Sequence, residues 1–319
     1  MLAKSEGPDP PSFATRVAGS SRVLVLGIGG GGDAVGSIAV ARALESRGVQ
    51  TVLGGVAWER IVVDPHPGPR GAADIRGGTK LSGAVIVDPE VGATTPEGVH
   101  FCESRLSTHL GEPTVLIDIT RGPPGAAGGI DSACAELGCD LAVLVDIGGD
   151  AIAAGQEPGL ASPLCDAVMI AAGEQASVPC VLGVLGAGCD GELEPGEVLE
   201  RVAALAGAGA WLETVGVTPQ AASEIEAAAK VAVTEASLLV ARAARGVIGP
   251  VEIRGGRREV ELGPVAALAF MFDLSTALAA LPLAQAVAGA PSIEAARDSL
   301  NDMGVSTELD YEERQAAAL

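Results

Sequence analysis

The chain has 319 residues, of which 48% are apolar and 19% are charged. This balance is too apolar for a disordered chain, and it is enough for one large domain or two ordinary ones. The 41 acidic residues outweigh the 20 lysines and arginines and leave a formal net charge of −21. Since this charge would repel nucleic-acid phosphates and an anionic membrane surface, we exclude nucleic acid and membrane as partners.

Targeting and redox features point to the cytoplasm. Residues 1–21 are rich in Pro, Ser and Gly without an apolar stretch, which predicts a disordered leader and not a signal peptide. The apolar window 265–290 is interrupted by Asp273 and Pro282 and predicts a buried strand and helix. Six cysteines without a C-x-x-C pair, and only three histidines, make a zinc cage hard to assemble. We therefore expect a cytoplasmic protein with free thiols.

Short apolar runs alternate with Ala-rich helical stretches in the first two thirds of the chain. Residues 22–27 read as a buried strand and residues 33–47 as the helix that follows it. Further strands are predicted at 51–57, 84–87, 114–117, 141–145 and 180–185. This alternation predicts an α/β fold, with a doubly wound, mainly parallel, Rossmann-like ligand-binding domain over residues 22–194.

The pattern changes at Pro195. Residues 195–208 and 219–245 read as two helices, and a basic turn at 254–258 separates short strands at 251–253 and 259–262. We interpret residues 195–319 as a helical cap or extension packed on the sheet. Its Ala-rich helices permit a homo-oligomer.

A glycine-rich turn, Gly27-Ile-Gly-Gly-Gly-Gly-Asp33, joins the first predicted strand to its helix. Glycines let backbone N–H groups approach an anion, and a helix N-terminus favours negative charge. The spacing also satisfies G-x-G-x-x-G, although the acid that would hold a ribose, Glu59, follows Gly32 by 27 residues where about 20 is usual. A turn needed only for close packing is the third interpretation. We predict that the substrate's phosphate is bound by Gly29, Gly30, Gly31, Gly32 and Asp33.

Acidic residues follow the other predicted strands. The carboxyl ends of parallel strands lie at one edge of the sheet, where open α/β proteins bind ligands. A single Asp after a strand is most often a helix cap or a turn residue. Several acids brought together, however, repel one another unless a cation, hydroxyl groups or shared protons compensate them. The acids that we expect to converge are Asp118, Asp146, Asp150 and Asp190.

These residues receive provisional roles. We expect Asp146 and Asp150 to bind a divalent cation, for which Mg²⁺ is the candidate, and Asp146, Asp150 and Asp190 to be catalytic. Arg254, Arg257 and Arg258 are either solvated surface charge or a cover for an anionic group from the cap side. Residues 234–237 are a polar break in a helix and a weaker candidate. Further substrate-binding residues are expected to be Asp118, Arg121, Gly148, Gly149 and Glu192.

Five segments carry a family resemblance. They are Val23–Asp33, Val145–Asp150, Gly159–Asp166, Gly186–Leu193 and Thr307–Tyr311. Together they resemble the bacterial and archaeal family catalogued as domain of unknown function 1152, over nearly the whole chain after the leader. The resemblance implies that the glycine turn and the Asp-Gly-Gly-Asp segment are family hallmarks, and it implies no reaction.

Three functions fit these features. The first is an enzyme acting on a small, anionic, phosphorylated or nucleotide-like molecule that contains a sugar, by lyase, hydrolase or transferase chemistry. The glycine turn would hold the anion, and the strand-end aspartates would hold hydroxyls or a cation. The second is an oxidoreductase that uses NAD(P) or FAD. The third is a nucleotide-binding subunit without activity.

Overall fold

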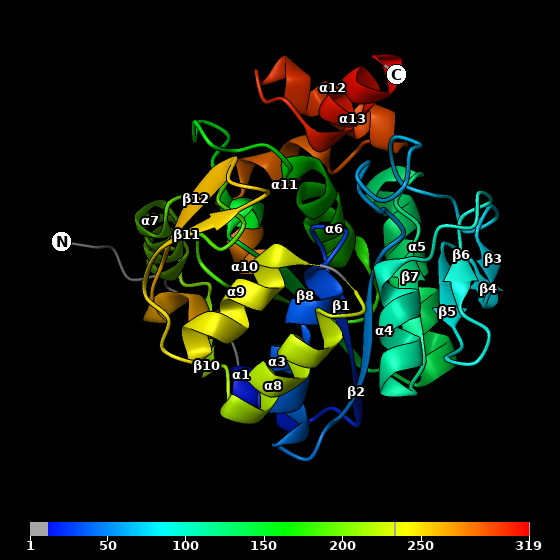
Figure 1. The fold of residues 1–319 in the computed structure, drawn as a ribbon. Coiled ribbons are helices and arrows are strands. Elements are labelled where there is room, and N and C mark those ends of the chain that lie inside the picture. Colours follow the sequence, from blue (N-terminus) through cyan, green and yellow to red (C-terminus); the bar gives the residue numbers. More distant parts are fainter. Residues whose placement is uncertain (1–11, 233, 319) are drawn as a thin grey trace.

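A computed structural model of the chain describes residues 12–232 and 234–318 (Figure 1). Its main sheet has nine strands, in the order β10-β13-β9-β8-β1-β2-β7-β5-β4. The strands are β1 (Arg22–Gly27), β2 (Gln50–Val56), β4 (Thr79–Leu81), β5 (Ala84–Val87), β7 (Thr114–Ile117), β8 (Leu141–Ile147), β9 (Cys180–Leu185), β10 (Trp211–Gly216) and β13 (Leu268–Asp273). Strands β7, β2, β1, β8 and β9 are parallel, while β5 and β13 run antiparallel to their neighbours.

Helices cover both faces of the sheet because the central strands bury side chains on both sides. In β1, Leu24 and Leu26 join one hydrophobic core, and Val23 and Val25 join the other. The first core contains residues of α5 (Gly122–Leu137), α6 (Pro163–Gln175), α7 (Pro195–Gly207), α10 (Leu274–Leu278), α11 (Pro282–Val287), α12 (Ile293–Asp302) and α13 (Glu308–Ala317). The second contains residues of α1 (Phe13–Ala18), α2 (Asp33–Gly36), α3 (Ile38–Glu45), α4 (Cys102–Leu110), α8 (Pro219–Ala228) and α9 (Glu235–Ala244).

Short elements complete the fold. Strands β3 (Arg76–Gly77) and β6 (Ala93–Thr94) pair with each other, and β11 (Gly249–Ile253) and β12 (Arg258–Leu262) form an antiparallel hairpin. The 3-10 helices are η1 (Asp150–Ile152) and η2 (Pro264–Ala267). None of the helices in the described part of the chain is long and apolar enough to span a membrane. Residues 265–290 instead contain β13 and short helices, in agreement with the predicted buried strand and helix.

The predicted α/β fold with a mainly parallel sheet is confirmed, and three local differences follow. Residues 195–319, predicted as a helical extension with short strands of its own, also contribute β10 and β13 to the main sheet. The helix predicted at 33–47 is divided at Ser37, whose hydroxyl donates to the carbonyl of Asp33. The helix predicted at 219–245 is divided before α9, where Thr234 forms the N-cap.

The predicted disordered leader also differs from the structure in part. Residues 1–11 lie outside the described residues. Residues 13–18 form α1, which the Ser12 hydroxyl caps by accepting the N–H of Thr15. Phe13 and Val17 lie one helical turn apart and are both buried, so that this short helix is anchored on the second core.

Candidate acidic site at the sheet edge

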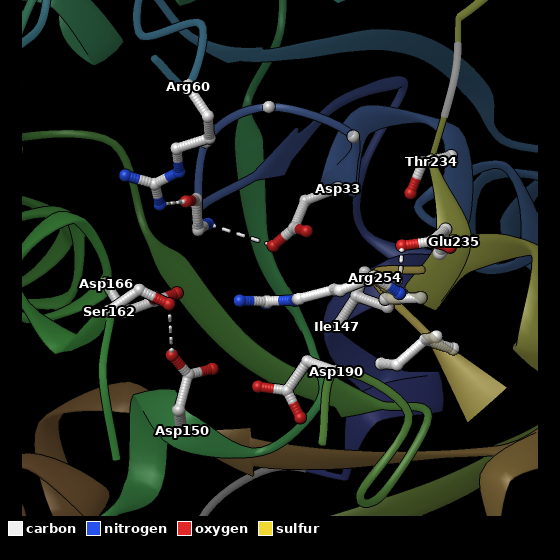
Figure 2. A pocket seen from close by; sticks show the side chains of 16 residues that line it. Asp33, Arg60, Ile147, Asp150, Ser162, Asp166, Asp190, Thr234, Glu235 and Arg254 are labelled. Atoms are coloured by element: carbon white, nitrogen blue, oxygen red, sulfur yellow. Dashed lines mark hydrogen bonds between the residues drawn. The ribbon is translucent and has the colours of Figure 1, made fainter. Parts of the chain in front are cut away.

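A polar pocket of about 170 Å³ lies at the carboxyl ends of the central strands. The chain passes from β1 to β2 on one side and reaches β8 on the other, so that the strand order reverses beside β1. Such a reversal opens a crevice in which α/β proteins bind ligands. Figure 2 shows the carboxylates of Asp33, Asp150, Asp166 and Asp190 around this pocket.

Three acids from different elements form what we call the inner trio. Asp33 begins α2, Asp146 lies near the end of β8, and Asp166 lies in the first turn of α6. A carboxylate oxygen of each lies within 4.8 Å of one from each of the others. Asp146 and Asp166 are 0% and 1% exposed, and none of their four carboxylate oxygens has a hydrogen-bond partner among the described residues. Since buried polar atoms are nearly always hydrogen-bonded, these four oxygens need an explanation.

A second trio consists of Asp150, Asp190 and Glu192, with the same spacing limit of 4.8 Å. More donors lie close to it than to the inner trio. The Glu192 carboxylate accepts the N–H of Ala161 at 2.7 Å and the hydroxyl of Ser162 at 2.6 Å. Two guanidinium groups also approach Glu192, that of Arg254 at 3.6 Å and that of Arg258 at 3.8 Å. The second trio is therefore partly compensated by the protein, whereas in the inner trio the Gly29 N–H reaches Asp33 alone.

Burial makes ionisation of these acids difficult. It raises the pKa of Asp33 to about 7, against a hydrogen bond from the Gly29 N–H that lowers it. Burial, followed by the charges of Asp33 and Asp190, raises the pKa of Asp146 well above its ordinary value. The pKa of Asp166 is raised likewise by burial and then by Asp146 and Asp33. The pKa of Asp150 is raised well above its usual range, and that of Asp190 to about 7, in both cases chiefly by burial.

Two glycines after β8 allow the second trio to assemble. Gly148 has φ +142° and Gly149 has φ +115°, a region that favours glycine. A Cβ at Gly148 would lie 2.7 Å from a carboxylate oxygen of Asp190, and one at Gly149 would lie 2.6 Å from Val198. Gly148 therefore permits Asp190 to pack closely against the end of β8, and Gly149 permits the close approach of Val198.

The glycine turn after β1 is held largely by the protein itself. The Gly29 N–H donates to Asp33 at 3.0 Å, and the Gly31 N–H donates to the carbonyl of Trp58 at 3.0 Å. The guanidinium of Arg60 donates to the carbonyl of Gly29. A Cβ at Gly32 would clash with the side chain of Thr234. Close packing thus explains part of the glycine content of this turn, and two of its amides already have acceptors.

Helix α13 supports the site from the far end of the chain. Its Glu308 carboxylate accepts the N–H groups of Leu164 and Cys165 at 3.0 and 2.8 Å, at the start of the helix that carries Asp166. The same carboxylate lies 3.6 Å from the guanidinium of Arg60. One turn later, Glu312 accepts the indole N–H of Trp58 at 2.9 Å. Helix α13 therefore holds in place two parts of the pocket, the start of α6 and the segment after β2.

Most of the residues expected from the sequence meet at this pocket. Asp118, Arg121, Gly148 and Gly149 do not line it. Asp118 accepts the N–H of Ala72 at 2.7 Å and that of Thr120 at 2.9 Å, as a turn residue does, and Arg121 is exposed ahead of α5. Those that line the pocket or belong to its trios are Gly29, Gly30, Gly31, Gly32, Asp33, Asp146, Asp150, Asp190 and Glu192.

The sequence analysis missed four residues of the site. Asp166 follows Pro163 in the first turn of a helix, where an acid is common without a ligand. Its place in one of the family-like segments was the available signal. Arg60 lies in the loop after β2, so the strand-end rule that located the aspartates would also have indicated this residue. Ser162 and Glu308 also lie in family-like segments, but their roles depend on tertiary packing that no local pattern indicates.

The fold and pocket define the class of protein: a doubly wound α/β protein with a buried acidic pocket at the carboxyl edge of its sheet. The chain belongs to the family described as "Protein of unknown function (DUF1152)", which matches residues 24–316. No curated protein and no solved structure matches the chain.

Proposed function

We propose that this protein is a divalent-cation-dependent enzyme that acts on a small phosphorylated, sugar-containing or nucleotide-like molecule. The cation would be held by the inner trio. The observation that carries this proposal is that, within residues 12–232 and 234–318, the buried carboxylate oxygens of Asp146 and Asp166 have no hydrogen-bond partner. One oxygen of each lies within 4.8 Å of an oxygen of Asp33. Converging carboxylates without donors are compensated best by a positive ion.

The donor set supports a hard cation. All three ligands of the inner trio are carboxylates, and neither trio includes His or Cys. Oxygen ligands suit Mg²⁺, Mn²⁺ or Ca²⁺, whereas zinc sites in proteins usually contain nitrogen or sulfur. Asp146 was expected as a ligand together with Asp150. The proposal keeps Asp146 and assigns the neighbouring positions to Asp33 and Asp166.

The second trio would carry proton transfer. A pKa of about 7 for Asp190 suits a group that gives or takes a proton near neutral pH. Asp190 and Asp150 line the same pocket as Asp33 and Asp166, so that a bound substrate would contact both trios. A cation in the inner trio would polarise a phosphoryl or carbonyl oxygen or lower the pKa of a bound water. Hydrolase, transferase and lyase reactions at a phosphoester or glycosidic bond are compatible with this arrangement.

The geometry supports a dinucleotide-dependent oxidoreductase less well. Glu59, the residue expected to hold a ribose, accepts the N–H of Cys102. The carbonyl of Trp58 and the side chain of Arg60 already contact the turn at Gly31 and Gly29. A dinucleotide phosphate bound to the Gly31 N–H would have to displace the carbonyl of Trp58. We also propose a cytoplasmic location, which the six buried free cysteines favour.

Calorimetric titration with Mg²⁺ and with Mn²⁺ tests the cation site. We expect the parent protein to bind one of these ions, and Asp146→Asn and Asp166→Asn to bind it at least tenfold more weakly. Asp118→Asn is the matched control, because Asp118 is also a buried strand-end acid but belongs to neither trio. Equal cation binding by the parent and both inner-trio variants would refute the proposal. A screen of phosphate esters and nucleotides with the parent then identifies the reaction.

A further inference from the structure

A larger cavity of about 590 Å³ lies beside the acidic pocket, and we call it the arginine cavity. It is formed by the loop after β2, the loop before α6, the β11–β12 hairpin and helix α13. Only 20 of the 319 residues are Lys or Arg in a chain of net charge −21, yet several line this one space. These are Arg60, Arg254, Arg257, Arg258 and Arg314.

The two spaces adjoin each other. Arg60, Ser162, Glu235 and Arg254 line both the acidic pocket and the arginine cavity. A molecule that reached the trios with one end would therefore have its other end among the arginines. The acidic pocket, with about 170 Å³, is the smaller of the two and has room for a reacting group, while the arginine cavity has room for the remainder.

Arg254 is held in an unusual backbone conformation at this junction. Its φ is +53°, and among the described residues it is the one non-glycine residue with a positive φ. The Glu235 carboxylate fixes the turn by accepting the Arg254 N–H at 2.9 Å. Figure 2 shows the Arg254 side chain extending into the pocket, between Asp33 and Asp190. Conformations of this kind cost free energy and cluster at ligand sites.

Arg60 provides a second, independent indication of an anion. Its Nη1 is buried and has no hydrogen-bond partner among the residues that the structure describes, although the Glu308 carboxylate lies 3.6 Å away. A guanidinium has five N–H donors that match phosphate oxygens in pairs. The donor that remains unsatisfied belongs to a residue lining both spaces.

The acids that line the arginine cavity are already engaged by other groups. Glu192 accepts backbone N–H groups of the loop before α6, Glu308 accepts those at the start of α6, and Glu312 accepts the Trp58 indole. In the part of the chain that the structure describes, neither Arg257 nor Arg314 forms an ion pair. Their positive charge is therefore available to a ligand.

We infer that the arginine cavity binds the phosphate groups of the substrate, and that the substrate carries a diphosphate, or two phosphates, beyond the group that reacts at the acidic pocket. This inference rests on the proposed function, since it names the substrate class of the same site. Arg60 and Arg254 contact the phosphate nearer the acids, and Arg257 and Arg314 the outer one. The inference also places the main anion site at these arginines and not at the glycine turn, where two of the amides are already hydrogen-bonded.

Inorganic pyrophosphate is the probe for this cavity. Calorimetry at 150 mM salt compares the parent with the Arg257→Ala/Arg314→Ala double variant and with Arg76→Ala, an exposed arginine of β3 that lines neither space. We expect the parent to bind pyrophosphate with a Kd below about 1 mM, the double variant at least tenfold more weakly, and Arg76→Ala within twofold of the parent. Both arginines of the double variant are exposed, so the fold is expected to persist, and circular dichroism verifies it.

The outcomes separate this inference from the proposed function. Mg²⁺ is titrated in the same proteins without pyrophosphate, where the double variant is expected to match the parent. Pyrophosphate binding that is absent from the parent, or equal in the parent and the double variant, overturns the arginine cavity whatever Mg²⁺ does. Arginine-dependent pyrophosphate binding in a protein that binds no divalent cation would support the cavity and refute the cation site.

Discussion

The carboxylates of Asp146 and Asp166 converge from the end of β8 and the first turn of α6, and in the described part of the chain none of their four oxygens has a hydrogen-bond partner. Both residues are almost completely buried. Folded proteins are stable by only a small margin, so a buried pair that lowers stability indicates a function. We expect these two carboxylates to lower the stability of the cation-free protein, and a bound cation to restore it.

Asp166→Asn is therefore expected to stabilise the cation-free protein. It removes one of two converging buried carboxylates, which we expect to raise the free energy of unfolding by about 1–3 kcal/mol at pH 8. The same change removes a ligand, so Mg²⁺ is expected to raise the melting temperature of the parent but not that of the variant. Thermal unfolding in the presence of a chelator and of excess Mg²⁺ measures both effects.

For Asp118→Asn we expect the opposite effects on stability and on the response to Mg²⁺. Asp118 accepts three hydrogen bonds, two from backbone N–H groups and one from the Thr120 hydroxyl. An amide replaces one acceptor oxygen by a donor, so we expect a loss of about 1–3 kcal/mol in stability and an unchanged response to Mg²⁺. A lost Mg²⁺ response in this variant would show that the inner trio is not the cation site.

The stability of the cation-free protein should fall as pH rises. Burial raises the pKa of Asp33 from its ordinary 3.8 to about 7. Between these values the folded state holds the proton more tightly than the unfolded state does, so its contribution is complete below about pH 4 and is lost as pH rises through about 7. Asp190 acts in the same direction. Because protons compete with the cation, the rise in melting temperature caused by Mg²⁺ should be larger at pH 8 than at pH 5. A rise that is independent of pH would contradict this linkage.

Helix α13 should act on the site through Glu308. In Glu308→Gln, one of the two acceptors for the Leu164 and Cys165 N–H groups becomes a donor, and the charge facing Arg60 is lost. We expect a loss of about 1–3 kcal/mol in stability, together with weaker Mg²⁺ binding because the first turn of α6 positions Asp166. Glu313→Gln, at an exposed position of the same helix, is the control. Equal Mg²⁺ binding in both variants would show that α13 has only a structural role.

The strain at Arg254 can be separated from its role in binding. Glycine adopts a positive φ without the steric cost that alanine bears, so Arg254→Gly should be about 1 kcal/mol more stable than Arg254→Ala. Both variants lose the guanidinium and should bind pyrophosphate about equally weakly. Denaturant unfolding and calorimetry measure the two effects. If Arg254→Gly bound pyrophosphate as the parent does, the guanidinium would have no part in holding the anion.

The sheet could be predicted from the sequence because its central strands are continuous apolar runs followed by glycines or acids. This pattern indicates which strands are buried and where they end, and from it we predicted that Asp146, Asp150 and Asp190 lie together. Strands β10 and β13 were not predicted as part of the sheet. The burial pattern of β10 is only partial, and β13 was placed in the extension because chain order does not show which edge a late strand joins.

The site could be predicted only in part, because strand ends can be recognised in the sequence whereas contacts between distant segments cannot. Asp166 belongs to a helix, and Glu308 lies 142 residues later, so their roles follow from packing that no local pattern encodes. In the glycine turn, the chemistry of the residues indicated an anion site, while the structure shows that Asp33 and Trp58 accept two of its N–H groups.

Diffraction from crystals soaked in Mn²⁺, with data collected near the manganese absorption edge, tests the central claim most directly. The account predicts an anomalous peak between the carboxylates of Asp33, Asp146 and Asp166, which disappears in crystals of Asp166→Asn. A map without a peak at this position at saturating Mn²⁺, or a peak that persists in the variant, would contradict it.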